Sequence, residues 1–360
     1  MRLGIIGLPQ SGKTTIFNAL TRGNRPITTS GSRFDVHTAV VDVPDERVDQ
    51  LSTLYKPKKT IYAKVTYADI AGLDGSAGKD GISGALLNQL SQMDGFLHVV
   101  RCFDDPNVPH PAGSVEAQRD IQTMDGELLI NDMIVVERKL ERLAEERRKG
   151  GGRDRGLIDR ELAIFERLNQ ALAEEKPLRT VQLTVEEEKI LSGFALLTRK
   201  PILILLNLSE GQQVPASVKL TGERCGEDAC IPLQGKLEME IAQLPAEEAQ
   251  VFLDEYGIEE PGLYRVIRLS YDLLNVHSFF TVGPDEVRAW TLPCGANAYE
   301  AAGMIHSDLQ RGFIRAEVIS VEDLLLLGGL SDARAKGKLR LEGKEYIVQE
   351  GEIVHIRFNI

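Results

Sequence analysis

Four short segments of the chain are rich in apolar and β-branched residues, at positions 3–7, 64–69, 96–101 and 202–207. Longer stretches with the periodicity of helices separate them. Strands that are buried on both faces consist of near-continuous apolar runs, and strands that alternate with helices usually form a parallel sheet. The pattern therefore predicts an α/β fold, in which helices cover both faces of a parallel sheet.

A different pattern runs from about residue 125 to residue 195. Its first half carries apolar side chains at alternating spacings of four and three residues, which is the seam of a coiled-coil helix. These side chains are Leu129, Met133, Val136, Leu140 and Leu143. A second helical stripe follows, and it consists of Ile158, Leu162, Phe165 and Leu172. Glycines at 150–152 lie between the two stripes, and they predict a turn because glycine is unfavourable inside a helix.

We therefore expect an antiparallel α-helical hairpin with a glycine tip. Its first helix, residues 125–149, would be roughly 37 Å long at about 1.5 Å per residue. Two ordinary surface helices of the main domain are the alternative. The strand pattern resumes at Pro201, so the hairpin is an insertion and the first domain is discontinuous.

The pattern changes again after about residue 276, where short strands accompany one helix. We expect strands at 287–292, 313–319 and 353–358, a β-hairpin at 339–348, and a helix at 297–309 with Asn297 as its N-cap. The predicted domains are thus an α/β domain of residues 1–124 and 196–275, the hairpin of residues 125–195, and a small α+β domain of residues 276–360.

Composition adds limits to this organisation. The 360 residues are 42% hydrophobic and 27% charged, which is typical of globular domains and excludes disordered, collagen-like and disulfide-scaffold classes. The apolar run at 202–206 is far too short to span a membrane, and the N-terminus reads as a strand. Four cysteines in the whole chain indicate a reducing, cytoplasmic environment, and Cys225 and Cys230 lack the second pair that a zinc site needs.

The charge is unevenly distributed. A net charge of −12 argues against a broad nucleic-acid-binding surface. Eight basic and four acidic residues between positions 138 and 155 nevertheless give the hairpin tip a charge of +4. The basic residues are Arg138, Lys139, Arg142, Arg147, Arg148, Lys149, Arg153 and Arg155. A basic tip on a long arm could reach ribosomal RNA through phosphate contacts, which we assign to Arg147, Arg148 and Lys149, and a solvated helix end is the alternative.

The strongest chemical signal is the sequence GLPQSGKT at residues 7–14, which matches the P-loop pattern and lies between a predicted strand and a predicted helix. Backbone N–H groups of such a loop surround phosphate oxygens, the lysine reaches the β- and γ-phosphates, and the following hydroxyl binds Mg²⁺. We therefore predict a site for a nucleoside triphosphate and Mg²⁺. Its P-loop contacts are Gln10, Ser11, Gly12, Lys13, Thr14 and Thr15.

A second phosphate signal ends the strand at 64–69. Asp69 is placed to hold the metal together with Thr14, and the N–H group of Gly72 is placed to sense the γ-phosphate. The glycines that follow at 75, 78, 81 and 84 suit a switch loop that the γ-phosphate orders, and an unconstrained surface loop is the alternative.

The base-selecting motif departs from the pattern of GTPases, which carry Asn-Lys-x-Asp at the end of this strand. Here the sequence is NLSE at 207–210, so the acid is the longer Glu210 and Leu208 replaces the lysine. A carboxylate accepts hydrogen bonds from guanine, whereas adenine presents an acceptor there. We expect weakened guanine selection, with Asn207 bonded to the purine and Leu208 packed on it. A degenerate motif that keeps its guanine preference is the alternative.

Taken together, these motifs resemble the YchF/Obg-like ATPase family, within the Obg branch of P-loop GTPases. The match covers nearly the whole chain and includes VPD at 43–45, DIAGL at 69–73 and VVRCFDD at 99–105. It is strongest in FFTVGP at 279–284, VRAWT at 287–291, IHSD at 305–308 and RGFIRAEVI at 311–319, which resemble the TGS module, a ubiquitin-like β-grasp domain. The hairpin matches the family's coiled coil.

The resemblance implies an ATPase that prefers ATP to GTP, associates with ribosomes, and has a role in translation and stress response. Leu73 occupies the position where many related GTPases carry a water-orienting glutamine. The resemblance instead assigns this task to His110, on a mobile loop, and it assigns Phe103 to stacking on the adenine. With Lys13 and Gly72, His110 forms the predicted catalytic set.

Two positions depart from the family pattern. Gln10 and Ser11 replace Asn-Val, which leaves potassium dependence open, and Arg33 aligns with the threonine of the first switch. Two other functions therefore stay open beside a ribosome-associated ATPase. One is a guanine-specific translation GTPase, and the other is a nucleotide-gated binding protein with negligible hydrolysis.

Overall fold

The computed structural model describes residues 1–23, 36–70, 73, 82, 84–150, 152–216, 218, 230–255 and 258–359. The chain forms two compact units, which are Met1–Ala39 with Thr66–Leu263, and Val40–Val65 with Tyr264–Ile360. Arg33, Gly72 and Cys225 lie outside the described residues, as do three of the glycines predicted to form a switch loop.

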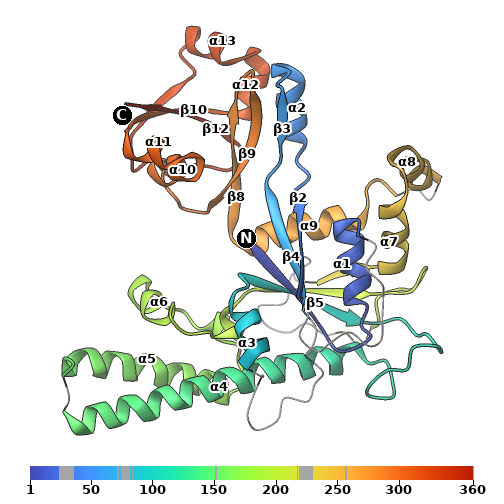
Figure 1. Ribbon diagram of the computed structural model, residues 1–360, viewed down its shortest axis with the longest axis vertical. Helices are drawn as coiled ribbons and strands as arrows, with labels where there is room; N and C mark the ends of the chain where they lie inside the picture. The colour runs from blue at the N-terminus through green and yellow to red at the C-terminus, as the bar shows by residue number, and fades with distance from the viewer. Residues whose placement is uncertain are drawn as a thin grey trace. The chain divides into compact units, whose positions relative to one another are not determined.

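The first unit is built on a six-stranded sheet in the order β2-β4-β1-β5-β6-β7 (Figure 1). The strands are β1 (Arg2–Ile6), β2 (Val36–Asp42), β4 (Lys64–Ile70), β5 (Gly95–Arg101), β6 (Ile202–Asn207) and β7 (Cys230–Leu233). Neighbours from β4 to β7 run parallel, so the predicted parallel α/β sheet is confirmed. The apolar pattern missed β2, which is largely exposed, and β7, which is four residues long.

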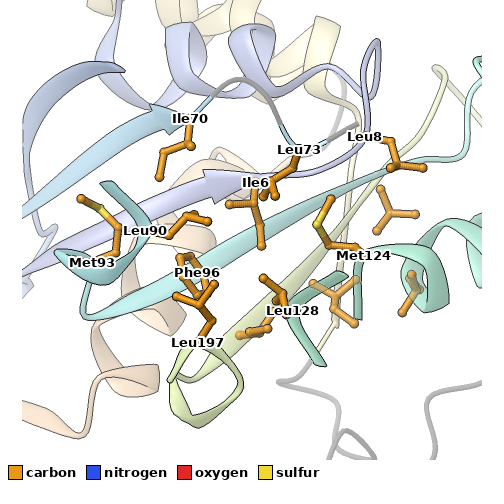
Figure 2. Packing of buried hydrophobic residues seen from close by; sticks show 14 of the residues in the cluster. Ile6, Leu8, Ile70, Leu73, Leu90, Met93, Phe96, Met124, Leu128 and Leu197 are labelled. Carbon is orange, nitrogen blue, oxygen red and sulfur yellow. The ribbon is translucent and has the colours of Figure 1, made fainter. Parts of the chain in front are cut away.

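Helices alternate with these strands along the chain. They are α1 (Lys13–Thr21), α3 (Gly84–Ser91), α4 (Ala117–Lys149), α5 (Arg155–Ala173), α6 (Val185–Leu191), α7 (Gly235–Gln243) and α8 (Ala246–Glu255). The next helix, α9 (Gly262–Leu273), lies mostly in the second unit. Figure 2 shows the core between the sheet, α3 and the start of α4, where Ile6, Ile70 and Phe96 of the sheet face Met124 and Leu128 of α4. Burial of these side chains fixes the start of α4 on the sheet.

The predicted helical hairpin is confirmed, and its first helix is longer than expected. The helix α4 has 33 residues and begins at Ala117, upstream of the predicted start at 125. Gly150 ends it with a φ of +66°, a conformation that glycine adopts without strain. The seam positions Val136 and Leu143 are fully buried against α5, and α4 and α5 lie side by side in Figure 1.

A buried carboxylate joins the hairpin to the sheet. Asp132 of α4 accepts hydrogen bonds from the backbone N–H groups of Leu197 and Thr198, at 2.8 and 2.7 Å, and from the Thr198 hydroxyl at 2.6 Å. Burial raises the pKa of Asp132, and these hydrogen bonds oppose the rise. The contact fixes α4 at the short 3₁₀ turn Leu197–Arg199, from which the chain enters β6.

The second unit contains a sheet in the order β11-β10-β12-β8-β9-β3. Its strands are β3 (Lys59–Ile61), β8 (Val276–Val282), β9 (Glu286–Pro293), β10 (Phe313–Ser320), β11 (Arg340–Glu342) and β12 (Glu352–Phe358). Its helices are α2 (Glu46–Tyr55), α10 (Ala298–Ile305), α11 (Ser307–Arg311), α12 (Val321–Leu327) and α13 (Leu330–Ala335). The parallel pair β12–β8 is flanked by the antiparallel pairs β8–β9 and β10–β12, which is the arrangement of a TGS-like β-grasp domain.

Residues 40–65 belong to this second unit by their contacts, although the predicted boundaries assign them to the first domain. The strand β3 pairs with β9, with Lys59 opposite Glu286. The guanidinium of Arg47 pairs with Glu350 at 2.5 Å and lies over the ring of Phe280. The apolar pattern contains no sign of these contacts, because ion pairs and strand addition leave no periodicity.

Two predicted elements of the second unit differ from the structure. The helix predicted at 297–309 starts at its expected N-cap, Asn297, but it ends at Ile305, and His306 separates it from α11. The β-hairpin predicted at 339–348 is wrong. The residues of β11 pair with β10, whereas the Tyr346 carbonyl accepts from Ala298 N–H at 2.8 Å, so the second arm bonds to the start of α10 instead.

None of the helices that the structure describes has the length and apolar character that a membrane crossing requires.

Candidate functional site

The P-loop connects β1 to α1, and two of its glycines allow close packing against neighbouring strands. Gly7 has a φ of +150° and Gly12 a φ of +95°. A Cβ atom at Gly7 would lie 2.3 Å from the Val99 carbonyl oxygen of β5, and one at Gly12 would lie 2.2 Å from Nδ2 of Asn207. Side chains at these positions would therefore force the loop away from the sheet.

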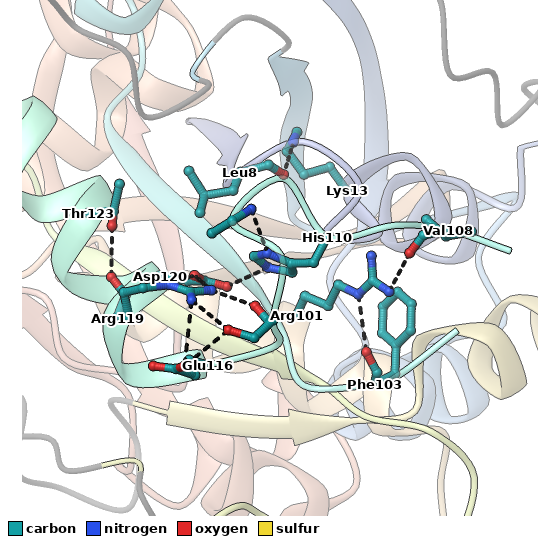
Figure 3. A network of polar contacts seen from close by, with 12 residues as sticks. Leu8, Lys13, Arg101, Phe103, Val108, His110, Glu116, Arg119, Asp120 and Thr123 are labelled. Atoms are coloured by element: carbon teal, nitrogen blue, oxygen red, sulfur yellow. Dashed lines mark hydrogen bonds and ion pairs between the residues drawn. The ribbon is translucent and has the colours of Figure 1, made fainter. Parts of the chain in front are cut away.

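Lys13 begins α1, and its ammonium group is held by the loop itself. Nζ donates to the carbonyl oxygens of Gly7 and Leu8, each at 2.8 Å (Figure 3 shows the Leu8 contact). Burial lowers the pKa of Lys13 to about 8, against the opposing charge of Asp69. A buried ammonium that is satisfied by two neutral carbonyls is suited to pair with anionic phosphate oxygens.

Thr14 and Asp69 are adjacent, as the sequence predicts. The Thr14 hydroxyl donates to Oδ2 of Asp69 at 3.1 Å, and Asp69 is buried in β4. A hydroxyl and a carboxylate are the oxygen ligands that Mg²⁺ prefers. Thr15 follows in the first turn of α1. Ser11 is buried, and its hydroxyl has no bonding partner among the described residues. Gln10 has a backbone φ of +61°.

Asn207 ties the P-loop to a second helix. Its Nδ2 donates to the Ser11 carbonyl at 3.0 Å, and its Oδ1 accepts from Gly235 N–H at 3.1 Å, at the start of α7. The next residue, Leu208, packs in the core beneath the sheet, and Glu210 is exposed. The structure thus brings Asn207 to the P-loop and gives it a bonding role that the sequence did not predict.

Phe103 follows β5 and borders the P-loop. One edge of its ring would lie 3.9 Å from a Cβ atom at Gly12. The fully buried Arg101 supports the ring from behind, with its guanidinium carbon 4.5 Å from the ring centroid (Figure 3). Arg101 also donates to the carbonyls of Phe103 and Val108, at 3.1 and 2.7 Å. In the sequence, the sign that Arg101 supports the Phe103 loop is its position as a charged residue at the end of an apolar strand.

His110 lies against the first turn of α4, with a side chain that is 3% exposed. Nε2 lies 2.8 Å from Oδ2 of Asp120, and Nδ1 accepts from Ala112 N–H at 3.1 Å (Figure 3). The other oxygen of Asp120 accepts from Nε and Nη2 of Arg119, at 3.0 and 2.8 Å. Neither Asp120 nor Arg119 lies in the predicted seam, so no pattern in the sequence indicates either residue.

His110 and the P-loop line one crevice, which is too tight to hold a water molecule. It is lined by Leu8, Pro9, Ser11, His98, Val99, Val100, Arg101, His110 and Asp120. Leu73, at the position of the usual water-orienting glutamine, is buried in the core cluster instead. Among the described residues that were singled out from sequence, the P-loop, Asp69, Phe103, His110 and Asn207 therefore meet at one edge of the sheet.

Comparisons with known proteins agree with this arrangement. A family model described as 50S ribosome-binding GTPase matches residues 2–139, and the YchF-GTPase_C model, described as a protein of unknown function, matches residues 276–359. The Ribosome-binding ATPase YchF of Bacillus subtilis is 42% identical over 369 residues, which is 99% of each chain. The protein of that name from Escherichia coli O157:H7 is 39% identical, over 100% of this chain and 99% of its own.

The chain belongs to the YchF family. The solved YchF GTPase of Schizosaccharomyces pombe has a TM-score of 0.82 and 32% sequence identity to it, and the match covers 99% of this chain and 97% of that one. The resemblance inferred from the motifs is therefore confirmed. The fold class is confirmed as well, since a P-loop domain, an inserted helical hairpin and a TGS-like domain make up this YchF-family chain.

The burial of Lys13 predicts that triphosphate binding takes up a proton at high pH. The free protein has a pKa of about 8 at this group, and phosphate charge would raise it. Below pH 8 the Lys13 ammonium is charged both in the free protein and in the protein with bound triphosphate. Above pH 8 binding must protonate it, so the affinity should fall by up to about tenfold per pH unit. Calorimetry at pH 9 in buffers of different ionisation enthalpy measures the uptake.

The matched control for this measurement is Lys13→Arg, because a guanidinium stays charged throughout the range. That variant should bind the triphosphate without proton uptake. Equal uptake by the variant and the parent protein would contradict the assignment to Lys13.

Proposed function

We propose that this chain is an ATP-hydrolysing switch protein that binds ribosomes. The observation that carries the proposal is the meeting of the P-loop, the Thr14–Asp69 pair and His110 at one edge of the sheet. Relatives that match over the full length are named Ribosome-binding ATPase YchF, and that name supports hydrolysis and the ribosome as partner.

The residues around the P-loop fit a triphosphate and Mg²⁺. Gly7 and Gly12 let the loop lie directly against Val99 and Asn207, where a Cβ would collide, and Lys13 would exchange its two carbonyl partners for phosphate oxygens. Thr14 and Asp69 would hold Mg²⁺, with Asp69 acting through water. Bound Mg²⁺ would neutralise charge that develops on the β- and γ-phosphates.

The base-contacting residues support a preference for ATP. Phe103 offers a ring face beside the P-loop, held in place by Arg101. Glu210 is exposed on its loop, and its extra methylene displaces the carboxylate that would select guanine. Asn207 already bonds Ser11 and Gly235, so we assign it to positioning the P-loop as well as to the purine edge. A guanine-specific GTPase is the second candidate, because this position still carries an acid.

Hydrolysis would depend on His110. Leu73 is buried among apolar side chains and has no group that bonds water. The imidazole of His110 lies in the crevice that borders the P-loop, so a movement of its loop would bring a ring nitrogen to the attacking water. Lys13 and the N–H of Gly72 complete the proposed catalytic set.

The hairpin tip supports contact with ribosomal RNA, together with the TGS-like domain. Four of its eight cations form ion pairs with the described residues: Lys139 contacts Glu161 at 2.8 Å, Arg147 contacts Asp159 at 2.9 Å, Lys149 contacts Glu145 at 3.0 Å and Arg153 contacts Glu146 at 3.0 Å. Arg148 and Arg155 are exposed and form no ion pair with the described residues. Unpaired guanidinium groups bind phosphate without first breaking a contact. Arg138 and Arg142 are also exposed without an ion pair among the described residues, but Arg148 and Arg155 lie closest to the glycine turn, so these two are the strongest candidates at the tip.

Base preference is tested by competition of ATP and GTP against a fluorescent nucleotide. We expect ATP to bind more tightly. Glu210→Asp, which restores the acid length that GTPases use, should narrow the difference. Tighter binding of GTP by the parent protein would favour the guanine-specific GTPase.

The role of His110 is tested by steady-state phosphate release. His110→Ala should lower kcat about a hundredfold, the usual size of a lost proton-transfer or water-positioning group, with little change in KM. The exposed His306 of the second unit offers a matched control, and His306→Ala should leave kcat unchanged. If the parent protein releases phosphate no faster than a sample without protein, with and without ribosomes, the nucleotide-gated binding protein is the favoured function.

The tip is tested by cosedimentation with ribosomes over a range of salt concentrations. Replacing both Arg148 and Arg155 by Gln should weaken binding and reduce the salt slope by about one to two, because each phosphate contact adds about one. ATP affinity should not change. Lys176→Gln with Lys189→Gln removes the same charge from exposed residues outside the tip, and an equal loss from this control would contradict a contact at the tip.

A further inference from the structure

We propose that Asp120 is a positioning residue that holds His110 in a resting conformation, and that hydrolysis requires its release. The inference rests on the proposed function, because it assumes that His110 acts on the attacking water. It adds a second residue, on the helical hairpin, to the control of that step.

Both ring nitrogens of His110 are already bonded. Nδ1 accepts the N–H of Ala112 at 3.1 Å, so it carries no proton, and Nε2 therefore donates to Asp120 at 2.8 Å. The ring is almost fully buried. No nitrogen is left to accept from water or to donate to it, so the imidazole must leave this position before it can act.

The carboxylate that holds the ring is itself firmly placed. Arg119 donates twice to the second oxygen of Asp120, and the same guanidinium bonds the carbonyl of Ser114 at 2.6 Å. Asp120 lies in the first turn of α4, and the following turns bury Met124 and Leu128 in the core. The acceptor thus belongs to the fixed framework of the domain.

The loop that carries His110 has the opposite character. Residues 111–114 are exposed, and Gly113, with a φ of +79°, would meet no atom within 4 Å of an added Cβ. Arg101 fixes the earlier part of the loop at Phe103 and Val108. The later part is held to α4 by the His110–Asp120 and Arg119–Ser114 contacts. Few buried contacts oppose opening there, so the His110–Asp120 bond is a controlling one.

The opposing interpretation is that Asp120 activates His110, as the aspartate does in an Asp–His pair that orients a general base. Such a pair binds one nitrogen and leaves the other directed at the reacting group. Here the second nitrogen is bonded to Ala112. The arrangement therefore fits a restraint on His110 rather than its activation.

The experiment compares phosphate release by the full-length protein with that of Asp120→Ala. Loss of the restraint should raise kcat about fivefold, the factor that one hydrogen bond of ordinary strength supplies, while KM for ATP changes little. Asp120→Asn keeps an acceptor for Nε2 but removes the ion pair with Arg119, and it should give an intermediate rise. The ¹⁵N shifts of His110 should move from a single Nε2–H tautomer toward a mixture in Asp120→Ala.

Two controls separate the possible results. His110→Ala with Asp120→Ala should turn over no faster than His110→Ala alone, and Asp132→Asn, which disturbs another buried carboxylate of α4, should not raise kcat. A lower or unchanged kcat in folded Asp120→Ala, or a gain that persists without His110, would overturn the restraint. An unchanged kcat in His110→Ala alone would instead contradict the proposed function.

Discussion

The parallel register of four strands is the constraint on which the site depends. It aligns Ile5 with Asp69 across β1 and β4, Ile6 with His98 across β1 and β5, and Arg101 with Asn207 across β5 and β6. Because the carboxyl ends of these strands share one edge, the segments that follow them meet there. Each segment then supplies one part of the site, although the parts lie far apart in the sequence.

At that edge the P-loop lies close to the neighbouring strands, and only glycines avoid steric clashes there. The P-loop lies so near β5 and β6 that side chains at Gly7 and Gly12 would collide with the backbone of Val99 and the amide of Asn207. Because the loop is so near, Asn207 forms one hydrogen bond with Ser11 of the P-loop and one with Gly235 at the start of α7. The requirement for these residue types follows from the fold as much as from phosphate chemistry, so a P-loop motif constrains the strands beside it.

The sequence predicts the parts of this molecule that have a regular period or a fixed motif. The strands, the hairpin seam and the P-loop are examples, since burial and phosphate binding each demand particular residues at particular spacings. Asp120 could not be predicted, because its meaning depends on a loop that folds back onto α4. The same holds for residues 40–65, whose partner strand is more than 200 residues away in sequence, and for Leu208, which is drawn into the core.

Asp132 marks the point at which α4 passes from one hydrophobic core to another. Side chains up to Leu128 pack beneath the sheet, whereas Val136 and Leu143 pack on α5. At about 1.5 Å per residue, Asp120 lies about 18 Å before this joint and Lys149 about 26 Å beyond it. Because burial of Met124 and Leu128 holds the start of α4 on the sheet, the helix beyond Asp132 is a cantilever, and a force on the tip acts as a bending moment at this joint while Asp120 stays in place.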